Sequence, residues 1–293
     1  MRIIILGAGA GGGLPQWNCG CANCDGARAG RLAAMTQSSV AVSADGKAWA
    51  IINASPDIRA QLQATPALHP TGLREMPLGA VLLTNGDIDH VAGLLSLRES
   101  QRFDLFATQA IHAVLADNPV FAALNPALVP RRPVALDAAF TLAPGLTATI
   151  FAVPGKVPLY LEGDEVATDL VAETTVGVEL TAKGRRALYI PGCADLPAWL
   201  LARIDGADAL LFDGTLWTDD EMIAAGLGQK TSRRMGHMPV TDSLPRLAGA
   251  RLGQRAYIHI NNSNPLCDPA SDPARQVQAA GWQIARDGME ITL

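Results

Sequence analysis

The sequence predicts an α/β protein in which two β-sheets are covered by helices. The first half of the chain is rich in hairpin signals, and strand-like runs recur with helical segments throughout. Of the 293 residues, 49% are hydrophobic and 17% are charged, which is typical of a globular chain with a large core. There is no clear internal repeat and no low-complexity linker, so we expect a single domain over residues 1–293. It would consist of two αβ halves joined near 136–140.

Strand and turn signals follow one another through the first part of the chain. The predicted strands are 2–6, 38–43, 47–53 and 80–83. The glycine-rich stretch 7–13 predicts a loop. Asp45-Gly46 is a strong turn signal, so the second and third strands are expected to form a hairpin. Ser55 suits a helix N-cap and Pro56 the first helical position.

The rest of the chain continues the alternation of strands and helices. Further strands are expected at 146–153, 174–181, 186–190, 209–212 and 255–260, and helices at 91–101, near 110–116, at 243–247 and at 276–280. Lys183-Gly184 predicts a second hairpin between the strands on either side of it. The C-terminal runs 282–286 and 289–293 predict a terminal hairpin.

The charge pattern and hydropathy exclude some classes of function. The net charge is −5, and basic residues form no stripe, which disfavours a nucleic-acid-binding surface. No apolar run reaches the roughly 18 residues of a membrane span. The apolar start resembles a signal peptide, but the glycines at 7–13 interrupt it and Cys19 stands where cleavage would occur. We therefore expect a cytoplasmic protein without a membrane span.

Three of the five cysteines predict a structural zinc site. Cys19, Cys21 and Cys24 crowd into six residues, whereas Cys193 and Cys267 are isolated. Three cysteines so close together cannot all pair with one another, and thiolates on one tight loop can converge on Zn²⁺. The alternative is three buried free cysteines. A fourth ligand would have to come from far along the chain, which would staple the N-terminal region to another element.

The glycine-rich stretch also matches the letters of a dinucleotide-binding fingerprint. Such a fingerprint needs a helix that begins at the glycines, but Pro15 and the cysteine loop follow here. No second strand ends in an acidic residue at the expected distance. The sequence therefore favours a loop in which the backbone approaches another backbone or a ligand closely.

Acidic and histidine side chains gather at the ends of predicted strands. Asp87, Asp89 and His90 follow the strand at 80–83, and at a strand-to-helix junction they can converge on a metal. An Asx-type turn with a solvated histidine is the alternative. Further strand-end or loop groups are Asp213, His237 and His259. A lone histidine is more often structural, but several strand-end groups favour a shared site.

These motifs, in this order, resemble the pyrroloquinoline quinone (PQQ) biosynthesis protein B family of the metallo-β-lactamase superfamily. The resemblance runs nearly end to end. The matching stretches are the glycine loop with the cysteines, then 37–39, 53–58, 84–90, 153–156, 213–217, 236–239 and 259–262. It implies a metallo-β-lactamase-like αββα sandwich with its site at the sheet edges.

The chain departs from the hydrolases of this superfamily at their metal ligands. Those enzymes carry a His-x-His-x-Asp-His loop for two zinc ions, whereas this loop reads Asn85-x-Asp87-x-Asp89-His90. The next metal histidine would fall near Gly155 and the bridging carboxylate near Gly192, and glycine supplies no ligand. Because a dinuclear hydrolase needs these groups to form hydroxide, the departure argues against simple hydrolysis.

The resemblance implies a role in PQQ biosynthesis through an active-site metal. Two histidines and one carboxylate describe a non-haem Fe(II) site. Here the histidines would be His90 and His259 and the carboxylate Asp89, with Asp87 or Asp213 as a further candidate ligand. The expected reaction is iron-dependent hydroxylation of the tyrosine ring of a Glu–Tyr-derived precursor. His237 and Asp213 would be catalytic, with His237 serving as an acid/base group or, alternatively, as an additional metal ligand. Partners would be that precursor and other PQQ biosynthesis proteins.

Further residues carry over with the resemblance. Asn85 and Lys156 would contact the substrate. In superfamily relatives with a similar cysteine trio, the fourth zinc ligand comes three residues after the last active-site histidine, which is Asn262 here. Asp25, a water molecule or His259 itself are the alternatives for that position.

Three other functions remain open on the sequence alone. A carrier for PQQ or its precursor, assisting transport, needs no redox metal and tolerates the missing histidines. A degenerate zinc hydrolase would keep part of the superfamily chemistry. A dinucleotide-binding oxidoreductase would make use of the glycine loop. Fold-level resemblance by itself does not fix the chemistry.

Overall fold

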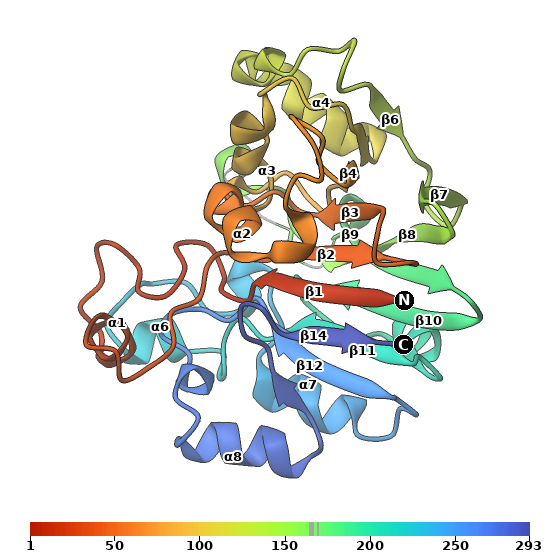
Figure 1. The fold of residues 1–293 in the computed structure, drawn as a ribbon. Helices are drawn as coiled ribbons and strands as arrows, with labels where there is room; N and C mark the ends of the chain where they lie inside the picture. The colour runs from red at the N-terminus through yellow and green to blue at the C-terminus, as the bar shows by residue number, and fades with distance from the viewer. Residues whose placement is uncertain (164–166, 169) are drawn as a thin grey trace.

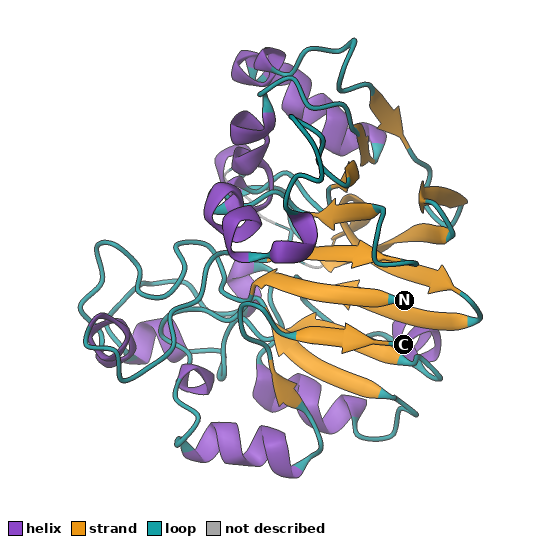
Figure 2. Cartoon of the chain, in the orientation of Figure 1, coloured by secondary structure: helices purple, strands orange, loops and turns teal. Residues whose placement is uncertain are grey.

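The structure is a computed structural model that describes residues 1–163, 167–168 and 170–293. In these ranges two β-sheets pack face to face, and helices cover both outer faces (Figures 1 and 2). This arrangement is the αββα sandwich that the resemblance implies. The chain crosses from the first sheet to the second between residues 133 and 139. The division into two halves joined near 136–140 stays a prediction.

Each sheet has seven strands within the described ranges. The first sheet contains β1 (Arg2–Gly7), β2 (Ser39–Ser43), β3 (Trp49–Ile52), β4 (Leu78–Leu82), β5 (Asp104–Ala107), β6 (Arg131–Pro133) and β14 (Glu290–Thr292). The second contains β7 (Ala139–Ala143), β8 (Leu146–Gly155), β9 (Leu170–Ala182), β10 (Arg185–Ile190), β11 (Ala209–Asp213), β12 (Gln254–Ile258) and β13 (Gln283–Ile284). Their spatial orders are β14-β1-β2-β3-β4-β5-β6 and β13-β12-β11-β10-β9-β8-β7.

The helices lie outside the sheets or in the loops at one edge (Figure 1). The α-helices are α1 (Ala22–Arg28), α2 (Ile58–Ala64), α3 (Ile88–Val91), α4 (Gln109–Asp117), α5 (Ala198–Ile204), α6 (Glu221–Ala224), α7 (Val240–Leu247) and α8 (Asp272–Ala279). The 3-10 helices are η1 (Pro66–Leu68), η2 (Ala92–Leu97), η3 (Pro119–Ala123), η4 (Leu159–Leu161), η5 (Arg233–Met235) and η6 (Pro265–Cys267).

The first strand, β1, is buried on both faces, which explains its uninterrupted run of apolar residues. Ile3 and Ile5 join the core between the two sheets, whereas Ile4 and Leu6 join the cluster that packs under the helices on the outer face. Successive side chains of a strand point to opposite faces, so a strand covered on both sides needs apolar residues at every position.

Both predicted internal hairpins are confirmed. β2 pairs with β3, and β9 pairs with β10, each antiparallel. The strands that follow run parallel: β3 with β4 and β5, and β10 with β11 and β12. Carboxyl ends of parallel strands share one edge of a sheet, which is where ligands bind in such sheets. Within the second sheet this brings the loops after β11 and β12 together. The loop after β4 belongs to the first sheet and joins them because the two sheets pack face to face, which places Asp89 3.2 Å from His259.

Three local predictions are wrong. The C-terminal runs form no hairpin, because β13 pairs with β12 and β14 pairs with β1 of the other sheet. The helix expected at 91–101 is replaced by α3 and η2, where Gly93 packs so closely that a Cβ atom there would lie 2.0 Å from the Ser55 carbonyl oxygen. α2 begins at Ile58 rather than Pro56, after a turn in which the Ser55 hydroxyl accepts from the Asp57 N–H.

The glycine loop is a close backbone crossing and not a dinucleotide fingerprint. The Gly9 N–H donates to the Thr36 carbonyl (2.8 Å), and the Ala10 N–H donates to the Ile260 carbonyl (2.9 Å). The first helix begins only at Ala22, and both neighbours of β1 are antiparallel to it. A dinucleotide site needs a parallel βαβ unit with a helix at the glycines, so this reading does not fit the structure.

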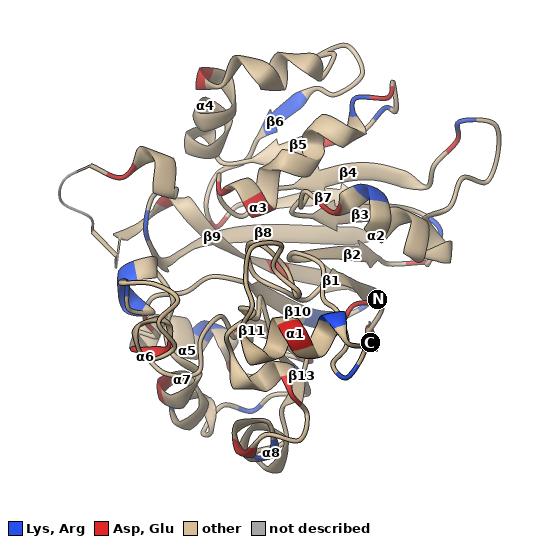
Figure 3. Ribbon diagram, turned by 90° about the vertical axis from the view of Figure 1, so that its left-hand side faces the viewer, with Lys and Arg blue, Asp and Glu red and all other residues tan. Residues whose placement is uncertain are grey.

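Charged residues of both signs are interspersed along the ribbon (Figure 3). Helices in the described ranges are too short or too polar to span a bilayer.

Candidate functional site

The loop after β4 presents His90 with a defined ring nitrogen. Oδ1 of Asn85 accepts the backbone N–H of Asp87 (3.0 Å) and Nδ1 of His90 (2.7 Å). A carbonyl oxygen can only accept, so Nδ1 carries the proton of the neutral ring and Nε2 carries the lone pair. Burial lowers the pKa of His90 to about 4, which keeps the ring neutral at neutral pH. Its Nε2 atom is buried and has no hydrogen-bond partner in the part of the chain that the structure describes.

Asp89 and His259 complete a cluster with His90. Oδ2 of Asp89 lies 3.2 Å from Nε2 of His259 and 3.8 Å from Nε2 of His90. One ligating atom of each residue lies within 4.8 Å of the other two. His259 has a φ of +62°, a strained conformation for a non-glycine residue and one that clusters at functional sites.

Asp89 and His259 stabilise each other's charged forms. Burial alone would raise the pKa of the Asp89 carboxyl, but His90 and His259 hold it well below its usual range. Burial alone would lower the pKa of His259, but the hydrogen bond to Asp89 and the nearby carboxylates raise it. A proton on Nε2 of His259 therefore bridges the ring to Asp89. A bound cation would take the place of that proton.

Asp213, Thr215, His237 and His259 form a buried network beside the cluster. Oγ1 of Thr215 lies 2.6 Å from Oδ1 of Asp213, 3.0 Å from Nδ1 of His237 and 2.8 Å from Nδ1 of His259. Oδ2 of Asp213 lies 2.8 Å from the same nitrogen of His237. The rings of His237 and His259 stack, with centroids 5.2 Å apart.

Asp213, His237 and His259 also have ligating atoms within 4.8 Å of one another. The Thr215 hydroxyl already hydrogen-bonds to all three of these side chains. The second group is thus satisfied by protein hydrogen bonds, whereas His90 in the first group keeps a buried nitrogen without a partner. Of the two groups, the first fits a metal ion better.

The two histidines of the cluster open onto a cavity of about 460 Å³. Its lining also includes Asp87, Lys156, Lys230 and His237. Asp87 stands outside the three-residue cluster, and burial together with the charge of Asp89 raises the pKa of its carboxyl. Nζ of Lys156 pairs with Glu162 at 2.9 Å. The cavity therefore combines a carboxylate–histidine cluster with ammonium groups.

The two glycines at the superfamily ligand positions have different surroundings. A Cβ atom on Gly155 would lie 2.9 Å from the side chain of Thr175, so this position has no room for a side chain. A Cβ atom on Gly192 would lie 3.5 Å from the ring of His237, which is ordinary contact. Here His237 occupies space beside the position where the hydrolases carry a bridging carboxylate.

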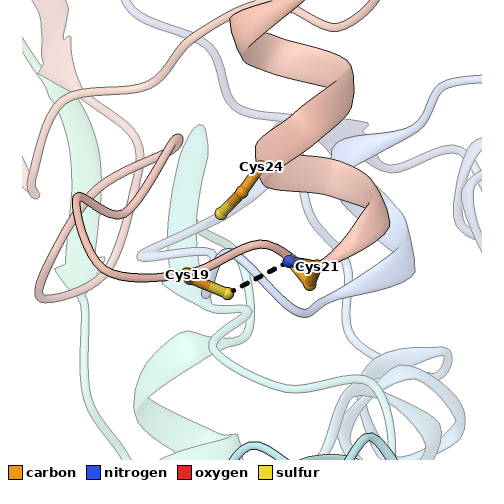
Figure 4. A group of neighbouring side chains, drawn as sticks. All are labelled: Cys19, Cys21 and Cys24. Atoms are coloured by element: carbon orange, nitrogen blue, oxygen red, sulfur yellow. Dashed lines mark hydrogen bonds between the residues drawn. The ribbon is translucent and has the colours of Figure 1, made fainter.

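The three clustered cysteines meet at the start of α1 (Figure 4). The Cys21 N–H donates to Sγ of Cys19 (3.4 Å), and Cys24 is buried on the first turn of the helix. Nδ2 of Asn262 lies 3.2 Å from Sγ of Cys19, 3.6 Å from Sγ of Cys21 and 3.4 Å from Sγ of Cys24. The structure thus brings together the four residues predicted for the zinc clip.

A second contact connects the cysteine clip to the segment that follows His259. Nδ2 of Asn23 donates to the carbonyl oxygens of Asn262 (2.9 Å) and Asn264 (3.0 Å). Asn262 follows His259 by three residues. The helix α1 and the cysteines therefore contact the chain just after this histidine. The alternative zinc ligand Asp25 instead pairs with Arg28 at 3.2 Å on the exposed side of α1.

Sequence reasoning missed the roles of two residues that the structure places in the site. Thr215 was part of a matching stretch, but only the fold shows its hydroxyl between two histidines. Glu162 gave no motif, yet it pairs with Lys156, Lys230 and Arg234. Asn85, expected at the substrate, has its carbonyl oxygen engaged by His90.

Comparison with known proteins agrees with the architecture. A sequence profile of the Beta-lactamase superfamily domain matches residues 48–260. Coenzyme PQQ synthesis protein B of Ruegeria pomeroyi is 59% identical over the full length of both chains. The protein of that name from Rhizobium meliloti is 54% identical over all of this chain and 98% of its own.

Solved structures give the same picture. The crystal structure of Zn(2+)-bound PqqB from Methylobacterium extorquens superposes with a TM-score of 0.98 and 52% identity, and the match covers both chains fully. A diphosphatase of the PhnP family shares the fold, with a TM-score of 0.69, 22% identity, and coverage of 99% of this chain and 97% of its own.

Proposed function

Since the chain belongs to the coenzyme PQQ synthesis protein B family of the β-lactamase superfamily, we propose that it acts in PQQ biosynthesis as an iron-dependent oxygenase. Its substrate would be a Glu–Tyr-derived precursor, hydroxylated on the tyrosine ring. One oxygen atom of O₂ is inserted into a C–H bond of the ring to give a hydroxyl group, and the other oxygen atom is reduced to water. Two electrons and two protons come from an external reductant.

The observation that carries this proposal is the cluster of Asp89, His90 and His259. Two imidazole Nε2 atoms and one carboxylate oxygen face one another, and the buried nitrogen of His90 has no protein partner among the described residues. Two histidines and one carboxylate with open positions are typical of non-haem Fe(II) oxygenases. When bound there, Fe(II) would supply the oxygen chemistry that the side chains of the chain lack.

Other side chains of the cavity would bind and orient the precursor. Lys156 and Lys230 line the cavity, and with Arg234 they bring three cations to the single carboxylate of Glu162. The excess positive charge suits a carboxylate of the precursor. Nδ1 of His237 is held by Asp213 and Thr215, so its Nε2 is free to take the proton of the phenol. Asp87 lines the same cavity and would hydrogen-bond a bound substrate or water.

We propose that the cysteine clip holds a structural zinc ion. Cys19, Cys21 and Cys24 would supply three thiolates. The amide of Asn262 now points its nitrogen at the sulfurs, and a half-turn about its Cβ–Cγ bond would bring Oδ1 to the same place as a fourth ligand. Sulfur-rich sites closed by the protein are structural rather than catalytic.

The test begins with protein whose clip is loaded with zinc and whose active site is reconstituted with Fe(II) without oxygen. A Glu–Tyr substrate and a reductant are added, then O₂, and products are weighed by mass spectrometry. We expect the mass of one added oxygen atom, dependent on iron. The His90→Ala and His259→Ala variants should lose it. No added oxygen, together with tight quinone binding by metal-depleted protein, would favour the carrier function instead.

A further inference from the structure

We propose that Thr215 is a positioning residue that relays the charge of Asp213 to His259. The inference rests on the proposed function only in taking His259 as a metal ligand. Among the described residues, Thr215 is the hydrogen-bond partner of Nδ1 of His259, at 2.8 Å. Both residues are buried, and both line the cavity.

Counting protons fixes the direction of each hydrogen bond. Oδ1 of Asp213 accepts the backbone N–H of Thr215 (3.0 Å) and faces its hydroxyl at 2.6 Å, while Oδ2 accepts the N–H of Cys193 (2.9 Å). A carboxylate has no proton to give, so the Thr215 hydroxyl must donate to it. The lone pairs of Oγ1 are then left to accept, and Nδ1 of His259 has to be the donor.

This direction decides which nitrogen of His259 is free for a metal. With one proton held on Nδ1, the proton that a cation replaces is the one on Nε2, the atom 3.2 Å from Asp89, and the lone pair of the then neutral ring lies on Nε2. Without the acceptor, the neutral ring could place its proton on Nε2 and block ligation. In many metal sites a carboxylate accepts the N–H of a ligating histidine and so fixes which nitrogen binds the metal. Here the Thr215 hydroxyl lies between the Asp213 carboxylate and the His259 ring.

The two histidines depend on Thr215 to different extents. Nδ1 of His237 has a second acceptor, Oδ2 of Asp213 at 2.8 Å, whereas Nδ1 of His259 relies on the hydroxyl. The backbone also contributes, because the Thr215 carbonyl accepts the N–H of Asn261 (3.0 Å), two residues beyond His259. Thr215 thus stabilises the strained turn at His259 through two hydrogen bonds, one made by its hydroxyl and one by its backbone carbonyl.

The variants Thr215→Val and Thr215→Ser distinguish the effect of the hydroxyl group from the effect of the side-chain shape. Valine keeps the volume and removes the acceptor, and serine keeps the hydroxyl. Thr65→Val is the matched control, since Thr65 is also buried and its hydroxyl donates to the Gln61 carbonyl in α2. If the valine variant fails to fold, Thr215→Ala takes its place.

The first readout uses metal-free protein labelled with ¹⁵N in its histidine rings. We expect a slowly exchanging Nδ1–H signal of His259 in the wild type, in Thr215→Ser and in Thr65→Val. It should be lost in Thr215→Val, while the signal of His237 persists. An unchanged His259 signal in a folded Thr215→Val protein would overturn the inference, whatever metal or reaction the site supports.

The second readout is Fe(II) affinity, measured without oxygen by competition with a chelator. We expect about 10–100-fold weaker binding in Thr215→Val and a change of about threefold or less in Thr215→Ser. Wild-type affinity in Thr215→Val would contradict the relay. If wild-type protein binds no iron, the proposed function fails, and the ring signals still decide the role of Thr215.

Discussion

At the scale of single residues, Asn85 determines which nitrogen His90 presents to the cavity. Its carbonyl oxygen is held in place by the Asp87 N–H and accepts Nδ1 of His90. In the hydrolases of the superfamily, the corresponding loop position carries a metal-binding histidine. Here the side chain supports a ligand instead of being one, which is consistent with a single metal ion in place of two.

The Asn85→Ala substitution should weaken metal binding at the cluster. The His90 ring loses its only acceptor among the described residues and is free to place its proton on Nε2. We expect Fe(II) affinity to fall by about 10–100-fold, as is usual when a partner of a metal ligand is removed. Anaerobic chelator competition measures it.

Asn85→Asp is the control, because it keeps an acceptor oxygen at nearly the same place. Its affinity should stay close to that of the wild type. If both variants bind iron as the wild type does, Asn85 has no part in orienting His90.

At the scale of secondary-structure elements, the cysteine clip and the end of β12 form one unit. The cysteine trio contacts Asn262, and Asn23 of α1 hydrogen-bonds to the same short segment. His259 lies three residues earlier in a strained conformation. Strain of this kind persists only where the surroundings hold it, so the clip contributes to the geometry of the active site from outside it.

Removal of zinc from the clip should loosen the segment that carries His259. We expect faster hydrogen exchange in a peptide spanning 259–264 after chelation, since the contacts of Asn262 depend on the ordered cysteines. Peptides from β8 and β9, far from α1 in the chain, serve as internal references. Re-addition of zinc should restore slow exchange, and equal exchange with and without zinc would show that the clip is independent of the site.

At the scale of the whole molecule, the C-terminal segment closes the first sheet and fastens the glycine loop. β14 pairs with β1, and the two termini lie side by side (Figure 1). The carboxylate of Asp287 accepts the N–H of Ala8 (2.9 Å), the N–H of Thr36 (2.7 Å) and the Thr36 hydroxyl (2.7 Å). One acidic residue near the C-terminus thus ties together two loops from the start of the chain.

The Asp287→Ala substitution should destabilise the protein measurably. It leaves the N–H groups of Ala8 and Thr36 without their acceptor, while the Thr36 hydroxyl keeps the Leu6 carbonyl at 3.1 Å. Hydrogen bonds to a charged group contribute about 1.5–3 kcal/mol. We expect the free energy of unfolding to fall by about 3 kcal/mol in equilibrium urea denaturation with zinc held constant.

Glu290→Ala provides the comparison for this measurement. Glu290 pairs with Arg2 at 2.7 Å, but both side chains are more than a third exposed. Such surface pairs contribute up to about 1 kcal/mol. If Asp287→Ala costs no more than Glu290→Ala, the buried carboxylate is not an anchor of the fold.

Much of this architecture follows from the sequence itself. Two hairpins were predicted from Asp45-Gly46 and Lys183-Gly184, because turn chemistry is local. Three cysteines within six residues predict a cluster for the same reason, and the structure brings their sulfur atoms together. The zinc ion itself stays a prediction. The αββα sandwich was predicted from the resemblance to the PQQ biosynthesis protein B family, whose motifs occur here in the same order.

Only the tertiary structure decided what depends on contacts between distant segments. The short runs at 283–284 and 290–292 have similar patterns, yet they join different sheets, because pairing depends on which edge each one reaches. Asp89 meets His259, 170 positions apart, because the two sheets pack face to face with the ends of β4 and β12 at the same edge of the sandwich. The role of Thr215 is equally non-local, since a threonine acquires a direction of hydrogen bonding only from the groups that the fold places around it.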